Sequence, residues 1–89
     1  MRILQNCKLR DIAGEKMLIV KSNGKLDFTK VVLMNSSAQL LYNELKDKSF
    51  TSADAAALLV NSYGIDAADA LRDSSNWLES MTKAGLITE

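Results

Sequence analysis

The sequence contains no histidine and only one cysteine, Cys7. Histidine is the commonest general base and metal ligand near neutral pH, so its absence removes the usual route to acid–base and metal chemistry. One cysteine without histidine can form neither an intramolecular disulfide nor a Cys–His nucleophile pair, and it cannot complete a zinc site of the usual kind. We interpret Cys7 as a small packing residue. The composition therefore predicts a protein that is not an enzyme and holds neither a metal nor a cofactor.

The sequence also lacks a long apolar run and an excess of either charge. Its longest apolar stretch, residues 55–60, is far shorter than the roughly 18 residues that a membrane span needs. No segment near the start resembles a signal peptide, and the single cysteine fits a reducing compartment, so we expect a cytoplasmic protein. Eleven Lys and Arg residues balance eleven Asp and Glu residues, whereas nucleic-acid-binding proteins usually carry a basic excess. We therefore expect neither a membrane nor a nucleic acid as partner.

The length and apolar content predict a single domain over residues 1–89. Hydrophobic residues make up 47% of the 89 residues, which is enough to build a core. A buried cavity for a large substrate would occupy much of that core. Shallow grooves and sheet edges are therefore the expected functional surfaces.

The first half of the chain has the composition of β-strands. We expect a short strand at residues 9–12, ended at Gly14, and a clearer one at residues 17–20. Asn23 and Gly24 follow, and this pair is a strong hairpin signal because both residues tolerate positive φ. A third strand is expected at residues 28–34, whose last four residues are apolar on both faces.

The second half has the period and the capping residues of helices. Any of residues 35–37 can cap a first helix, while Thr51 and Asp66 are expected to begin the second and third. Gly64 and Gly85 are suited to end the last two. The apolar stripes expected to face the core are Ala38, Leu40, Leu41, Tyr42 and Leu45; Ala55, Ala56, Leu59, Val60 and Tyr63; and Ala67, Ala70, Leu71, Ser74, Trp77, Leu78 and Met81. The prediction is an α+β domain with three antiparallel strands followed by three helices.

Several of these segments together resemble a known family. Residues 12–15 lead into the second strand, residues 32–35 precede the first helix, Phe50 and Thr51 open the second helix, and residues 77–87 close the chain. This pattern resembles the PqqD family, small winged-helix-like proteins whose founding member serves pyrroloquinoline quinone biosynthesis. The resemblance extends from about residue 9 to residue 87.

The resemblance implies a peptide chaperone, also called a precursor-peptide recognition element. Such a domain captures the leader of a ribosomally made precursor peptide and presents it to a modifying enzyme, often a radical SAM enzyme. The leader is expected to add as a strand beside the third strand, in the groove against the third helix. The implied peptide-binding residues are Lys30, Val31, Val32, Leu33, Met34, Asp69, Arg72, Asp73, Asn76 and Trp77.

Each of these signals also has a purely structural interpretation. The apolar run at residues 31–34 could be buried on both faces, left open for strand addition, or paired with a second copy in a homodimer. Trp77 has the spacing of a core residue, although it could also line a groove wall. Arg72 lies among several carboxylates, so it could form weak surface ion pairs or read charges on a leader peptide.

Two other classes of function remain as alternatives. A winged-helix DNA-binding protein would place its third helix in the major groove. The predicted third helix and its cap carry four carboxylates against two cations, which disfavours contact with a polyanion. The second alternative is a homodimeric structural module without a ligand of its own.

Overall fold

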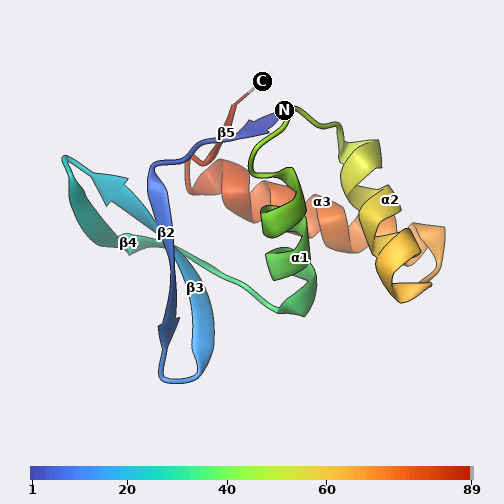
Figure 1. Cartoon of the computed structure of the whole chain (residues 1–89), viewed down its shortest axis with the longest axis horizontal. Coiled ribbons are helices and arrows are strands. Elements are labelled where there is room, and N and C mark those ends of the chain that lie inside the picture. Colours follow the sequence, from blue (N-terminus) through green and yellow to red (C-terminus); the bar gives the residue numbers. More distant parts are fainter. Residues whose placement is uncertain (89) are drawn as a thin grey trace.

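The computed structural model describes residues 1–88 and contains the predicted three strands followed by three helices (Figure 1). A two-stranded sheet formed by the two ends of the chain was not predicted. The elements are β1 (Arg2–Ile3), β2 (Cys7–Ile12), β3 (Glu15–Ser22), β4 (Lys25–Leu33), α1 (Ser36–Leu45), α2 (Ser52–Tyr63), α3 (Ala67–Lys83) and β5 (Ile87–Thr88). The α+β class is confirmed, and α3 is the longest helix.

Two tight turns connect the strands of the antiparallel sheet β2–β3–β4. Asn23 and Gly24 have φ values of 55° and 78°, which confirms the predicted hairpin. Ala13 and Gly14, with φ values of 54° and 83°, form a second turn of the same kind. Positive φ at both central residues gives a turn whose twist matches that of the strands. Both strands of this second hairpin therefore extend beyond the predicted residues.

The inner face of the sheet packs against the helices. Leu18, Val20 and Val32 are buried there in the main hydrophobic core. Ile19 is also fully buried, but it lies outside that cluster, on the opposite face of β3. The remaining buried core residues are Ile3, Met34, Ala38, Leu41, Tyr42, Leu45, Phe50, Ala55, Leu59, Ala70, Trp77, Leu78, Met81 and Leu86.

The helices begin at the predicted capping residues. Asn35 Oδ1 accepts a hydrogen bond from the Ala38 amide at 2.9 Å, so Asn35 is the cap of α1. Thr51 and Asp54 form the predicted capping box, because each side chain accepts a hydrogen bond from the other's backbone amide. Asp66 caps α3. Within the described chain, none of the helices combines the length and apolarity needed to span a membrane.

The end of α3 brings the two ends of the chain together. Gly85, at φ 75°, donates to the Thr82 carbonyl, and Leu86 donates to the Met81 carbonyl. This is the Schellman arrangement, in which a left-handed glycine ends the helix and the next apolar residue turns back onto it. Leu86 is fully buried as a result, as predicted for an apolar tail. The following strand β5 pairs with β1, so both termini lie at one edge of the molecule (Figure 1).

Three residues of the predicted apolar stripes are exposed, and their assignment to the core was wrong. Leu71 is 52% exposed and Tyr63 is 48% exposed, and Ala67 is also exposed. Leu71 follows the buried Ala70 by about 100° around the helix, which places it at the border of the buried stripe. The other two lie at helix ends, since Tyr63 is the last residue of α2 and Ala67 is the first residue of α3. Periodicity assigns a face to each residue but does not show where the opposing surface stops.

Candidate functional site

The outer edge of β4 is the site that the sequence singled out. Strand β3 occupies the centre of the three-stranded sheet, so β4 pairs on one side only within residues 1–88. The Met34 amide donates to the Lys16 carbonyl at 2.9 Å, and hydrogen-bonded pairs alternate along an antiparallel ladder. Val32 therefore directs its backbone groups toward β3. Val31 and Leu33 direct theirs away from the sheet, toward the open edge.

A bulge limits how much of this edge is straight. Ile19 pairs with Val31, but the next residue of β3, Val20, pairs with Asp27, so residues 28–30 are extra on β4. The Asp27 carboxylate accepts hydrogen bonds from the Thr29 amide and hydroxyl, which hold the bulge and lower the pKa of that carboxyl group. Bulges bend a strand and interrupt pairing along an edge. The straight part of the edge therefore begins at Val31 and ends near Leu33.

Two apolar side chains beside this edge are unusually exposed. Leu33 is 65% exposed and Phe28 is 63% exposed, the highest values among the large hydrophobic residues of the described chain. An exposed strand edge with apolar side chains can pair with a strand of another chain, and proteins normally cover such an edge or interrupt it with a bulge. The bulge at residues 28–30 prevents regular pairing along the first part of β4 but leaves residues 31–33 open.

A groove separates β4 from the C-terminal end of α3. Its volume is about 480 Å³. Lys30 and Lys83 are the only charged residues that line it, and Lys83 also contacts Glu79 at 3.0 Å. The complete lining is Thr29, Lys30, Val31, Val32, Leu33, Ser80, Lys83 and Ala84. A chain placed along the open edge of β4 would therefore have α3 as its second wall.

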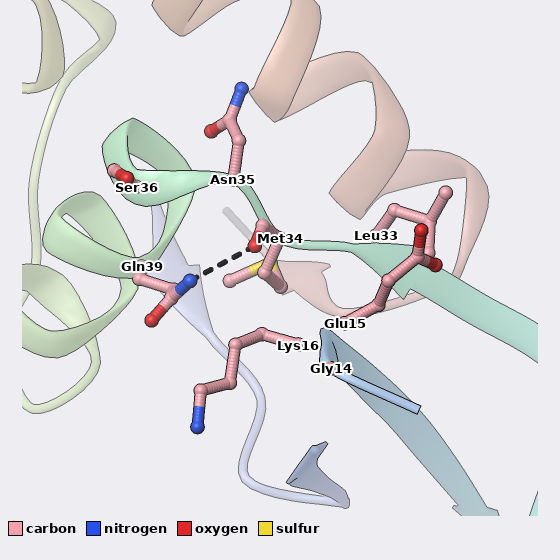
Figure 2. A pocket seen from close by; sticks show the side chains of 8 residues that line it. All are labelled: Gly14, Glu15, Lys16, Leu33, Met34, Asn35, Ser36 and Gln39. Atoms are coloured by element: carbon pink, nitrogen blue, oxygen red, sulfur yellow. Dashed lines mark hydrogen bonds between the residues drawn. The ribbon is translucent and has the colours of Figure 1, made fainter. Parts of the chain in front are cut away.

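A second hollow lies at the other side of Leu33 (Figure 2). This pocket of about 390 Å³ is lined by Gly14, Glu15, Lys16, Leu33, Met34, Asn35, Ser36 and Gln39. The Gln39 side-chain amide donates to the Met34 carbonyl at 3.0 Å, which ties the end of the strand segment to α1. Lys16 is paired with Asp11 at 3.1 Å. The exposed Leu33 side chain thus stands between two hollows, one toward α3 and one toward α1.

The predicted peptide-binding residues on the third strand lie in or beside the groove. Lys30, Val31, Val32 and Leu33 line it, while Met34 is a buried core residue that follows the strand. The interpretation of this run as buried on both faces is wrong for Leu33. The alternation along the strand, with Val32 inward and Leu33 outward, gives the edge one packed face and one exposed face.

The predicted residues on α3 lie between positions 69 and 77, in the first and middle turns of the helix and before the turn that lines the groove. Arg72 forms exposed ion pairs with Asp69 at 2.9 Å and Asp73 at 3.9 Å, as the surface interpretation predicted. Asn76 is exposed, whereas Trp77 is only 6% exposed and belongs to the core. Arg72 lies roughly 12 Å along the helix from the first groove residue of α3. A role for these five residues in peptide binding stays a prediction.

Sequence reasoning missed the part of α3 that lines the groove. Ser80, Lys83 and Ala84 share the groove with β4, and none was among the expected site residues. The helical period identifies which face of α3 is buried, but it does not show at which turn the helix passes β4. The Lys83 side chain, in the last turn of α3 and two residues before Gly85, is a local sign of a polar site at this end of the helix.

Cys7 was the one potentially reactive side chain, and it lies half-buried against the core. Its Sγ is 3.7 Å from the Tyr42 hydroxyl. Burial raises the pKa of the Cys7 thiol, and the Tyr42 hydrogen bond and the charge of Lys21 only partly offset this effect. Burial and the contact with Cys7 raise the pKa of Tyr42 to about 12. Both groups are therefore protonated at neutral pH, which suits the interpretation of Cys7 as a packing residue.

The fold and the groove together define a small winged-helix-like α+β protein with an open sheet edge beside a helix end. Residues 17–87 match the family model described as coenzyme PQQ synthesis protein D (PqqD). This match covers most of the chain, so the chain belongs to the PqqD family. Searches among curated proteins and among solved structures found no match.

Proposed function

We propose that this protein is a non-catalytic adaptor that binds the leader of a ribosomally made precursor peptide and presents it to a modifying enzyme. Membership of the PqqD family supports a peptide-binding role in biosynthesis. The open edge of β4 is the observation that carries the proposal for this chain. The leader adds there as a further strand, because main-chain hydrogen bonds to Val31 and Leu33 supply affinity and neighbouring side chains supply selectivity.

The short straight edge sets the strength of this binding. Two outward-facing residues offer one amide and one carbonyl each, and the bulge at residues 28–30 prevents further regular pairing. The interface is therefore small, and we expect a dissociation constant in the micromolar range, or about −8 kcal/mol. Such an affinity suits an adaptor that must release the peptide after modification.

The second partner in this proposal is the modifying enzyme. The family resemblance favours a radical SAM enzyme, which would act on the core of the peptide while its leader stays on β4. Because the added strand occupies the edge and the groove, the outer face of the sheet and the exposed faces of the helices stay accessible to the enzyme. A homodimer through β4 would cover the same edge, but it would bring together two groove linings that each carry two lysines and no carboxylate.

Calorimetric titration with short peptides encoded beside this gene tests the proposal. We expect one of them to bind with micromolar affinity and Leu33→Ala to weaken that binding about tenfold, because the Leu33 side chain borders both hollows. Leu71→Ala is the matched control, since Leu71 is also an exposed leucine but lies away from the groove. Equal loss in both variants, or no binding by any neighbouring peptide, would contradict the proposed function.

A further inference from the structure

The two faces of β4 impose different surroundings on the two sides of any strand added beside it. Side chains of successive strand residues point to opposite faces of a sheet. Val32 is buried on the inner face, so Val31 and Leu33 lie on the outer face. An added strand therefore places one set of side chains beside Val31 and Leu33. It directs the alternate set inward, toward the groove and α3.

The groove is cationic. Lys30 and Lys83 line it, and none of the other six lining residues is charged. Lys83 has an exposed partner in Glu79, whereas Lys30 forms no salt bridge within residues 1–88. Both lysines are exposed, so each attracts a carboxylate with the modest strength of a surface ion pair, and the two together favour an acidic partner. The side chains that fit this side best are aspartate and glutamate.

The distribution of charge along the chain points the same way. Residues 1–34 carry seven Lys and Arg against three Asp and Glu, while residues 35–89 carry four against eight. The strand half is therefore cationic and the helical half is anionic, although the whole chain is neutral. An acidic peptide approaching the protein is steered toward the sheet and away from the exposed carboxylates of α3.

We propose, resting on the proposed function, that the groove selects peptide strands in which apolar residues alternate with acidic ones. The apolar residues pack on the outer face against Val31 and Leu33, and the carboxylates face Lys30 and Lys83 on the inner side. A second copy of β4 does not meet this requirement, because residues 31–33, the straight part of that strand, include no carboxylate. The substrate class is therefore an amphipathic acidic segment of a leader peptide.

Three synthetic peptides of about eight residues, a typical strand length, test the selectivity. They alternate valine with glutamate, with glutamine or with lysine, and each is labelled for fluorescence anisotropy. We expect the glutamate peptide to bind about tenfold more tightly than the glutamine peptide, and the lysine peptide to bind most weakly. The preference should shrink when salt is raised from about 0.05 M to about 0.5 M, since exposed charges are then screened.

Substitutions of the two groove lysines test whether the preference for the glutamate peptide depends on the groove. Lys30→Gln and Lys83→Gln should each reduce the preference for glutamate to about threefold or less, while Lys48→Gln, an exposed lysine outside the groove lining, should leave it unchanged. Equal binding of all three peptides, or tighter binding of the lysine peptide, overturns the acidic selectivity while leaving the peptide-binding function intact. Failure of the glutamate peptide to bind, at concentrations where a leader encoded beside the gene binds, overturns it as well. Failure of both kinds of peptide contradicts the proposed function itself.

Discussion

At the scale of single residues, burial decides which apolar side chains stabilise the fold and which are free for other roles. Leu78 and Leu71 lie about two helical turns apart on α3, yet Leu78 is 9% exposed and Leu71 is 52% exposed. The first contributes to the core and the second covers only the border of it. Leu33, more exposed than either, contributes least to the core and borders the groove.

The two leucines of α3 should differ in their effect on stability. Leu78→Ala is expected to lower the free energy of unfolding by about 2–5 kcal/mol, because it removes buried methyl groups and leaves a cavity. Leu71→Ala should change it by less than about 1 kcal/mol, as surface substitutions usually do. Urea unfolding of both variants measures the difference. Equal losses would show that the buried stripe of α3 is assigned wrongly.

Tyr42 should make the protein sensitive to alkaline pH. Burial raises its pKa to about 12. Between about pH 10 and pH 12 the folded state therefore keeps the neutral phenol, whereas the unfolded state loses the proton. The corresponding stabilisation is complete below about pH 10 and is lost as the pH rises toward 12, by up to about 1–3 kcal/mol. The raised pKa of Cys7 acts in the same direction, beginning at lower pH.

Replacement of the phenol isolates this contribution. Tyr42→Phe should flatten the fall in unfolding free energy between about pH 10 and pH 12, because no proton is then lost at this position. Tyr63→Phe, at an exposed tyrosine, is the matched control and should keep the wild-type slope. An unchanged slope in the Tyr42 variant would mean that the phenol is solvated in the folded protein.

At the scale of elements, β4 is an edge strand with one paired side and one open side. One edge of the strand is paired with β3 and the other edge is open. Successive residues direct their backbone groups alternately toward β3 and toward the open edge. The bulge at residues 28–30 then confines the open part to the end that meets α3 and α1. The geometry of this one strand therefore sets both the position and the modest size of the proposed interface.

Proline substitutions distinguish the paired side of β4 from the open side. Val32→Pro removes an amide that faces β3 and should lower the unfolding free energy by at least about 1–3 kcal/mol through the lost ladder bond. Leu33→Pro removes an amide that faces the open edge, where proline is tolerated, and should be clearly less destabilising. Urea midpoints of the two variants give the comparison. If Leu33→Pro is the more damaging change, the register of β4 is wrong.

Local signals in the sequence were sufficient for most of these elements. The turn at Asn23 and Gly24 and the capping box at Thr51 and Asp54 act between residues a few positions apart, so their chemistry is visible in the sequence. The pairing of β1 with β5 joins opposite ends of the chain through two residues on each side, and no local pattern encodes it. The bulge in β4 likewise depends on the register with β3, which the residues of β4 alone do not determine.

At the scale of the whole molecule, the three-stranded sheet projects from the helical part (Figure 1). The strand half of the sequence is cationic and the helical half is anionic. The candidate groove lies where they meet, at the end of α3. The strand residues of this site were predictable because an apolar run at an edge is a local feature. The helix residues were not, because the turn at which α3 passes β4 depends on the packing of the entire core.

An NMR titration of the labelled protein with peptides encoded beside its gene shows whether a leader peptide adds to the open edge of β4. The largest amide shifts should fall on residues 30–33 and on Ser80, Lys83 and Ala84. The Val31 and Leu33 amides should also become protected from hydrogen exchange, because they form new hydrogen bonds. Shifts that extend to Asp69, Arg72 and Asp73 would add the N-terminal part of α3 to the site. Shifts confined to α1 and α2, with the amides of residues 31 and 33 still exchanging freely, would contradict the account.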